Sequence, residues 1–174
     1  MVPELENPKL MTLDAALDKR KELRRRRLRL VLTNGCFDLL HTGHLAFLRE
    51  ARRQGGALWV GINADESVKK LKGPLRPVQS QQERAFALAA LLWVDGVFIF
   101  HGERLTPEIR TLAPDLYVKA GDYSLETLNP EERQALRECG AEIRFLPFLA
   151  GFSTTSLIER IHRAAAADPS GSSR

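Results

Sequence analysis

The chain has 174 residues, of which 44% are hydrophobic and 28% are charged. This length and composition fit one globular domain with a substantial core, and no apolar run approaches the ~18 residues that suggest a membrane span. Two cysteines, Cys36 and Cys139, are too few for a disulfide framework, and the polar first residues contain no secretory signal. We therefore expect a cytoplasmic protein with no membrane partner.

Much of the positive charge lies in residues 19–29, KRKELRRRRLR, and the net charge is +4. We interpret this run as a solvated helix face. A nucleic-acid site is the alternative, but no aromatic residues interleave the run and no recognition motif accompanies it, so no nucleic-acid partner is expected. An acidic small substrate would also favour a positive surface.

The first half of the chain is predicted to alternate helices with buried strands. Thr12 is a suitable N-cap for an amphipathic helix, and Asn34-Gly35 ends an apolar strand. The next helix carries an apolar stripe and stops at Gly55-Gly56. The predicted elements are, in chain order, helix 12–26, strand 28–35, helix 42–54, strand 57–63 and helix 65–72.

The second half continues the same alternation. Two prolines break residues 73–79, and Ser80 stands three residues before Glu83, which is capping-box spacing. The predicted elements are helix 81–93, strand 96–100, helix 106–112, strand 115–120, helix 129–139, strand 141–148 and helix 154–164.

Strands that alternate with helices at short connections predict an α/β fold with a single doubly wound parallel sheet of about five strands. The predicted organisation is an N-terminal polar segment and basic helix over 1–27, one domain over 28–164 and a disordered tail over 165–174. In such sheets ligands bind beyond the carboxyl ends of the strands, near the point where the strand order switches. The segment after the first strand is therefore expected to line the site.

That segment, TNGCFDLLHTGH over residues 33–44, contains two of the four histidines of the chain. His41 and His44 are three residues apart at the predicted start of a helix, where side chains share a face and unpaired N–H groups favour an anion. Gly43 between them would let a bulky ligand approach the backbone. Metal ligands usually have i, i+4 spacing and a third ligand, and no such cluster follows. The pattern indicates either a phosphate site or polar capping residues.

Three further segments accompany this motif in order: LKGPLRPVQSQQERAFALAAL, DLYVKAGDY and FSTTSLIERI. With them, residues 33–161 resemble the nucleotidyltransferases that carry the H-x-G-H motif. The likeness is greatest to the adenylyltransferase domain of heptose-phosphate enzymes, which is often fused to a kinase. The K-G-x-x-R-P-V stretch of that subgroup is matched by residues 72–78, and its K-G-G-D-Y stretch by residues 119–123 with Ala120 in place of the first glycine.

The resemblance implies a Rossmann-like fold and a reaction that joins a sugar 1-phosphate, heptose 1-phosphate, to ATP and gives an ADP-sugar and pyrophosphate. It also implies Mg²⁺ bridging the nucleotide phosphates, with no dedicated metal site readable in the sequence, and a homodimer. The nucleophile is a phosphate oxygen of the substrate, so Cys36 is not required as a catalyst. Catalysis would depend on positioning two anions and neutralising the charge that develops between them.

By the same resemblance, His41, His44 and Lys72 are catalytic, and Lys72 with Arg76 binds the substrate phosphate. The residues assigned to nucleotide binding are Gly35, Phe37, Gly43, Lys119, Gly121, Asp122, Ser153, Thr154 and Thr155. Simpler interpretations remain open beside these. The loop cations could be solvated charges, Asp122 a loop cap, the hydroxyl run an ordinary N-cap, and Arg84 a surface ion-pair residue.

The sequence leaves two alternatives to this function open. Cytidylyltransferases acting on glycerol 3-phosphate or a similar alcohol phosphate carry an arginine in an R-T-E-G-I-S-T-T pattern, but PFLAGFSTT here has none, and the nearest preceding arginine is Arg144. A catalytically inactive nucleotide-binding module is the alternative of another class. Both histidines, Lys72 and the S-T-T segment are present, which argues against lost activity.

Overall fold

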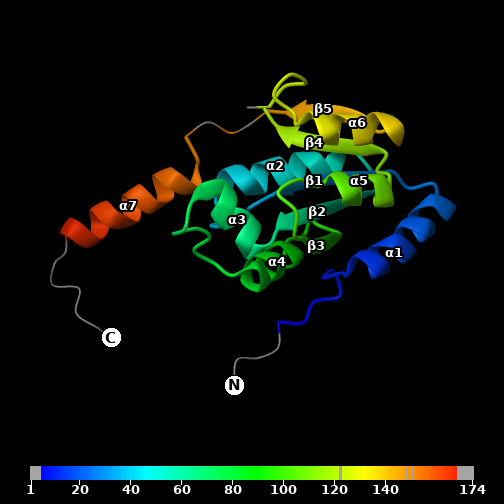
Figure 1. The fold of residues 1–174 in the computed structure, drawn as a ribbon. Coiled ribbons are helices and arrows are strands. Elements are labelled where there is room, and N and C mark those ends of the chain that lie inside the picture. The colour runs from blue at the N-terminus through cyan, green and yellow to red at the C-terminus, as the bar shows by residue number, and fades with distance from the viewer. Residues whose placement is uncertain (1–4, 122, 148, 150, 168–174) are drawn as a thin grey trace.

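The computed structural model describes residues 5–121, 123–147, 149 and 151–167, and it contains one parallel sheet in the strand order β3-β2-β1-β4-β5 (Figure 1). The five strands are β1 (Leu30–Gly35), β2 (Ala57–Asn63), β3 (Gly96–Phe100), β4 (Leu116–Ala120) and β5 (Glu142–Leu146). The prediction of a single parallel α/β sheet is confirmed.

Helices cover both faces of this sheet, as the doubly wound prediction requires. The helices are α1 (Leu13–Arg25), α2 (Thr42–Arg53), α3 (Asp65–Lys72), α4 (Gln81–Ala89), α5 (Thr106–Leu112), α6 (Pro130–Glu138) and α7 (Thr154–Ala167). One core cluster joins α2 and α4 to residues such as Val31 and Val60, and the other joins α1, α5 and α6 to their sequence neighbours Leu32 and Trp59. Successive strand residues therefore pack into opposite core clusters, because their side chains alternate between the two faces of the sheet.

Several predicted boundaries shift in the structure. Helix α4 ends at Ala89 rather than at residue 93, because the chain turns after Ala90 and brings Val94 into the core. Strand β5 spans Glu142–Leu146, since β4 offers it five partners, so residues 141 and 147 of the predicted 141–148 are not in the strand, and residue 148 lies outside the described part. Helix α7 continues to Ala167, so the first three residues of the predicted tail are helical, and residues 168–174 lie outside the described part.

The predicted boundary at residue 27 does not separate the N-terminal segment from the domain. Ala16 of α1 is fully buried, and Arg20 forms a 2.9 Å ion pair with Asp115 and donates to the Leu112 carbonyl. Residues 24–27 are exposed, so the prediction of a solvated basic face holds for them but is wrong for Arg20. A buried arginine needs such partners, because an unpaired charge would be costly there.

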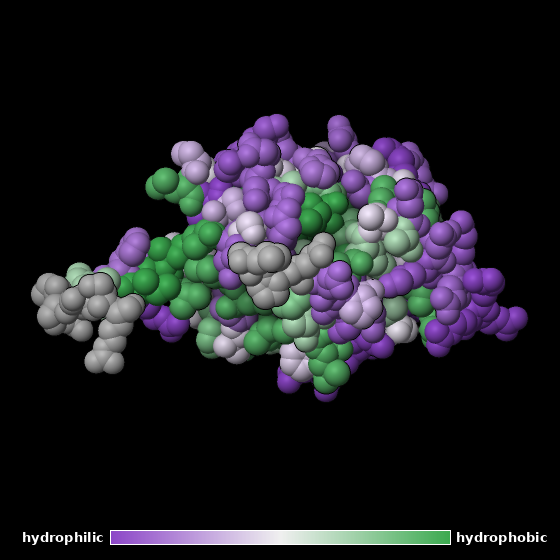
Figure 2. Space-filling view, turned by 90° about the horizontal axis from the view of Figure 1, so that it is seen from below, coloured by the Kyte–Doolittle hydropathy of each residue, from purple (hydrophilic) through white to green (hydrophobic). Residues whose placement is uncertain are grey.

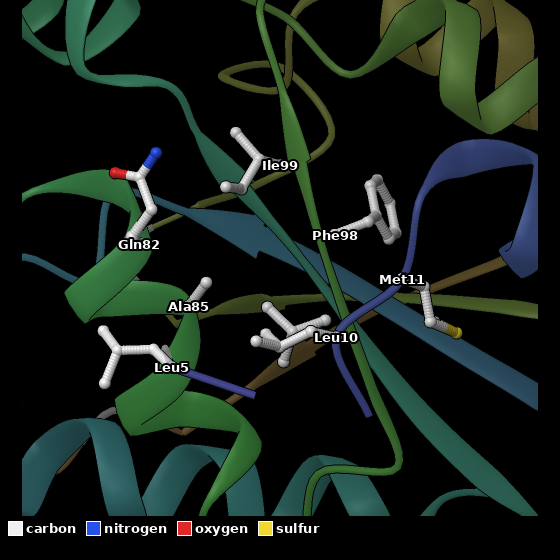
Figure 3. A pocket seen from close by; sticks show the side chains of 8 residues that line it. Leu5, Leu10, Met11, Gln82, Ala85, Phe98 and Ile99 are labelled. Atoms are coloured by element: carbon white, nitrogen blue, oxygen red, sulfur yellow. The ribbon is translucent and has the colours of Figure 1, made fainter. Parts of the chain in front are cut away.

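The N-terminal segment also extends the sheet edge. Leu10 bridges to Val97 of β3, and the two residues flank an apolar pocket of about 260 Å³ together with Leu5 and Ala85 (Figure 3). Among the side chains that line this pocket, none is charged. It therefore lacks the chemistry expected of a site for phosphorylated ligands.

Candidate active site

A cleft of about 800 Å³ lies beyond the carboxyl ends of β1 and β4, the two neighbouring strands at which the strand order switches. Its walls come from the segments that follow β1, β2, β3 and β4 and from the start of α7. The predicted site residues that line it are Gly35, Phe37, His41, His44, Lys72, Arg76, Lys119, Ser153, Thr154 and Thr155. Gly43 and Gly121 are not among the described residues that line it, and Asp122 lies outside the described part.

The two histidines form a stacked pair at the start of α2. His41 is the N-cap, and its Nδ1 accepts a 3.4 Å hydrogen bond from the backbone N–H of His44. The ring centroids are 3.8 Å apart, and Phe37 packs against His44 at 5.1 Å. His41 is thus a capping residue that also lines the cleft, so the capping interpretation is confirmed for it and the phosphate-site interpretation stays a prediction.

Burial sets the protonation of this pair. It lowers the pKa of His44 to about 4, helped by the neighbouring His41, and it also lowers the pKa of His41. Both imidazoles are therefore neutral at pH 7, and each carries one N–H donor. Because Nδ1 of His41 accepts a hydrogen bond, its proton lies on Nε2.

Two glycines make room for these rings. A Cβ at Gly35 would come within 3.1 Å of the Phe37 ring, and one at Gly43 would come within 3.1 Å of both the His41 ring and Phe152. The space at Gly43 is therefore filled by the protein itself rather than left for a ligand. That contact brings the segment before α7 close to the histidines.

The loop after α3 is fastened to the segment after β1 by a buried carboxylate. Asp38 accepts hydrogen bonds from the N–H groups of Val78 (2.8 Å) and Gln79 (3.1 Å), and its other oxygen lies 2.7 Å from Nε of Arg76. Arg76 is thus ion-paired rather than a solvated loop charge. Lys72, at the end of α3, is exposed and lines the cleft.

Arg84 is fully buried, so its interpretation as a surface residue is wrong. Its guanidinium donates to the carbonyls of Gln79, Cys36 and Asn63 at 3.1, 2.6 and 2.8 Å. It also pairs with Asp65 at 2.7 Å. One side chain therefore ties together the ends of β1 and β2, the start of α3 and the loop before α4.

The hydroxyl run at the start of α7 divides into two roles. Ser153 accepts a 3.0 Å hydrogen bond from the N–H of Ser156, so its hydroxyl acts as an ordinary helix cap. Thr154 and Thr155 also line the cleft, where their hydroxyls are available to a ligand. Helix α7 buries none of its residues against the described chain.

A second group of polar residues lines the cleft on the α5/α6 side of the sheet. Asn34, at the end of β1, accepts hydrogen bonds on Oδ1 from the Tyr117 hydroxyl and from Nζ of Lys119, both at 2.6 Å. This arrangement fixes the Asn34 side chain with its oxygen toward β4. Lys119 is 8% exposed and also lies 5.0 Å from the centre of the Tyr123 ring.

Glu132 belongs to the same group, although it is only 4% exposed. Its Oε1 accepts a 2.9 Å hydrogen bond from the backbone N–H of Leu105, which ties α6 to the start of α5. Burial raises the pKa of Tyr117 well above its usual value, and the negative charge of Glu132 acts in the same direction. Glu132 and Asn34 both line the cleft.

The sequence reasoning missed several of the residues that line the cleft: Asn34, Asp38, Asn63, Glu103, Arg104 and Glu132. Two of them, Asn34 and Asn63, end apolar strands, and that position at the carboxyl edge of a parallel sheet could have marked them. Glu132 offers no such signal, because a glutamate in the first turn of a helix is common for helix stability alone.

Within the described part of the chain, no three histidine, cysteine or acidic side chains gather as a metal site. No helix there has the length and apolar character needed to cross a membrane. Burial raises the pKa of the Cys36 thiol, which keeps it protonated at neutral pH. The chemistry offered by the cleft is thus that of hydrogen-bond donors and charges rather than of a protein nucleophile.

Comparison with known proteins finds a family that the chain matches over most of its length. The family model described as cytidylyltransferase-like matches residues 32–160. "Bifunctional protein HldE" of Syntrophotalea carbinolica is 46% identical over 138 residues, which are 79% of this chain and 28% of that protein. The protein of the same name from Helicobacter pylori strain J99 is 41% identical over 157 residues, 90% of this chain and 32% of that protein. The chain thus spans about a third of the length of these curated relatives.

A solved structure, that of the lipopolysaccharide core biosynthesis protein from Thermoplasma volcanium, superposes with a TM-score of 0.57 at 23% identity. It covers 70% of this chain and 97% of the other, and the likeness supports the fold. The family match spans the segments that form the sheet and the cleft. The chain therefore belongs to the cytidylyltransferase-like family.

Proposed function

We propose that this protein is a nucleotidyltransferase that joins a sugar 1-phosphate, heptose 1-phosphate, to ATP and releases pyrophosphate. The observation that carries the proposal is the stacked pair of neutral imidazoles at the start of α2, in a cleft shared with Lys72 and the hydroxyls of Thr154 and Thr155. Family membership and the relatives described above support the reaction class. The resemblance of residues 72–78 and 119–123 to the heptose-phosphate subgroup supports the acceptor and ATP.

The reaction needs no covalent enzyme intermediate. A phosphate oxygen of the sugar 1-phosphate forms a bond to the α-phosphorus of ATP, and the bond from that phosphorus to the α,β-bridging oxygen breaks. Pyrophosphate leaves with the electron pair of that bond, so negative charge grows on the leaving group in the transition state. Catalysis then consists of aligning two anions and stabilising that charge.

The residues of the cleft fit these tasks. The neutral imidazoles of His41 and His44 donate N–H hydrogen bonds to phosphate oxygens at the transferring centre. Lys72 supplies positive charge to the two phosphates that must approach each other. Thr154 and Thr155 donate hydroxyl hydrogen bonds at the start of α7, where the helix N-terminus also favours an anion.

Arg76 has a different part in this proposal from the one its sequence motif implies. Its ion pair with Asp38 holds the loop in place, and it can bind a substrate phosphate only by turning from that carboxylate or by bridging both. Phe37, Gly35 and Gly43 serve the site by shaping the ring contacts of the histidines.

The donor set also fits Mg²⁺ bound mainly through the nucleotide phosphates. Mg²⁺ keeps several waters and needs few protein ligands, and hydroxyl oxygens are the neutral ligands that the start of α7 offers. When bound, the ion supplies charge neutralisation of the triphosphate. The protein's own contribution is to hold the phosphates beside the imidazoles and Lys72.

The test is pyrophosphate release with Mg²⁺ from ATP, CTP and GTP separately, each offered with D-glycero-D-manno-heptose 1-phosphate in both anomers and with glycerol 3-phosphate. We expect release with ATP and the heptose phosphate. Release only with CTP and glycerol 3-phosphate would instead favour the cytidylyltransferase. Tight nucleotide binding without release from any pair would favour an inactive nucleotide-binding module.

We further propose that the protein acts in the cytoplasm as a homodimer. Helix α7 supports an intermolecular contact, since apolar side chains gather over it and none is buried against the described chain (Figure 2). Light scattering on the purified protein tests this point, and a monomer at micromolar concentration would contradict it.

A further inference from the structure

The cleft contains two regions of different chemistry. The phosphate region is made by His41, His44, Lys72, Thr154 and Thr155, whose side chains are neutral or positive donors. The polar region lies on the α5/α6 side of the sheet and includes Asn34, Glu103, Arg104, Lys119 and Glu132. The proposed reaction accounts for the first region but gives the carboxylate in the second no task.

The carboxylate of Glu132 disfavours a phosphate bound next to it. It is a nearly buried carboxylate, and Coulomb repulsion from an anion is strong where water is partly excluded. Its Oε1 is used by the N–H of Leu105, while Oε2 has no hydrogen-bond partner among the described residues. Because the residue lines the cleft, that oxygen can accept a hydrogen bond from a ligand.

Asn34 complements this acceptor with donors. Its Oδ1 already accepts from Tyr117 and Lys119, so the side-chain NH₂ group points away from both of them. No hydrogen bond from that NH₂ group is made to the described part of the chain. An acceptor and a donor that line one cleft suit hydroxyl groups, because each hydroxyl can donate and accept at once.

We infer that the polar region binds the hydroxyl groups of the sugar ring of the acceptor, with Glu132 accepting and Asn34 donating hydrogen bonds, and that Glu132 determines specificity for a polyhydroxylated phosphate ester. This inference rests on the proposed function for the identity of the acceptor. A site built to hydrogen-bond hydroxyl groups discriminates strongly against ligands that lack them, since its polar groups are then left unpaired.

The test is Glu132→Gln, which keeps an oxygen for the N–H of Leu105 but removes the charge. Glu131→Gln is the matched control, because Glu131 is the preceding residue in α6, is exposed and does not line the cleft. We measure KM for heptose 1-phosphate and for ATP by pyrophosphate release. The dissociation constant of heptose 1-phosphate alone is measured by titration calorimetry.

Glu132→Gln should raise KM and the dissociation constant for the sugar phosphate about tenfold, while KM for ATP changes less than about twofold. Asn34→Asp, which keeps the oxygen and removes the donors, should have the same selective effect, so the test does not depend on one variant folding. Unchanged sugar-phosphate binding in both variants would overturn the inference. So would a rise in KM for ATP instead, because the region would then serve the nucleotide.

Calorimetry separates the two hypotheses. In one outcome, the wild-type protein releases no pyrophosphate while Glu132→Gln selectively loses sugar-phosphate binding. That pair of results would support the hydroxyl-binding region and refute the proposed reaction. Wild-type turnover with unchanged binding in Glu132→Gln and Asn34→Asp would do the reverse.

Discussion

The phosphate region and the polar region of the cleft are built in different ways. In the phosphate region, a short motif at the start of α2 supplies both imidazoles, and a helix N-terminus supplies the hydroxyls. In the polar region, Asn34 comes from β1, Lys119 from β4 and Glu132 from α6, nearly a hundred residues apart from first to last. The difference teaches that side chains carried by motifs can be recognised from the sequence even when the motifs are far apart, whereas isolated residues such as Asn34 and Glu132 become candidates only when the fold places them in one cleft.

The largest expected effect tests the phosphate region. His44→Ala should lower kcat about 10³-fold, because it removes a donor aimed at charge that develops in the transition state. Steady-state pyrophosphate release measures this change, and circular dichroism checks that the fold persists. Wild-type turnover in a folded variant would show that His44 has no role in catalysis, and it would contradict the assignment of the phosphate region.

The free energy of unfolding tests the role of buried Arg84, which joins the loops around the phosphate region. Arg84→Met should lower the free energy of unfolding by about 3 kcal/mol, because three carbonyls and Asp65 lose a buried donor. Urea denaturation measures the change. Arg110→Met is the control, since its ion pair with Glu138 is exposed and should contribute less than about 1 kcal/mol. Equal losses in the two variants would mean that Arg84 does not organise the loops.

A smaller effect distinguishes ligand hydroxyls from capping hydroxyls. Thr154→Val keeps the shape of the side chain and should raise KM for ATP about tenfold through the loss of one hydrogen bond to an anion. The comparison variant is Ser156→Ala, whose hydroxyl donates to the Ser153 carbonyl at the start of α7. A similar KM for ATP in both variants would show that the start of α7 acts only as a helix cap.

The smallest effect concerns pH. The pKa of His44 is lowered from 6.5 to about 4 in the folded protein, so between these values the unfolded chain binds a proton that the folded chain excludes. The contribution of neutral His44 to stability is therefore complete above pH 6.5 and is lost as the pH falls toward 4. Between pH 7 and pH 5, the Tm of His44→Asn should fall by a few degrees less than the Tm of the wild type. Parallel losses of Tm would contradict a buried neutral imidazole.

Much of this molecule could be predicted from the sequence. Alternation of apolar strands and amphipathic helices predicted the parallel sheet, because each periodicity reflects which faces are buried. Cap signals such as Ser80 with Glu83 placed helix starts correctly, and the structure contains that capping box. The end of α4 was less readable, since residues 91–93 continue a helical pattern and only the packing of Val94 requires a turn.

The arginines show where sequence reasoning stops. Arg20 lies in a run of charged residues and Arg84 follows Glu83, yet both arginines are buried and paired with carboxylates 95 and 19 residues away, Asp115 and Asp65. A solvated charge and a buried, satisfied one have the same sequence appearance, because the partners come from tertiary packing. For the same reason Asp38, which holds Arg76 and the loop before α4, could not be singled out.

The most direct test of the two-region account is a crystal structure with Mg²⁺, α,β-methylene ATP and heptose 1-phosphate. The account predicts the triphosphate between the His41–His44 pair and Thr154, with the sugar hydroxyls within hydrogen-bond distance of Glu132 and Asn34. A triphosphate bound beside Glu132, or a sugar ring bound away from Asn34, would contradict it.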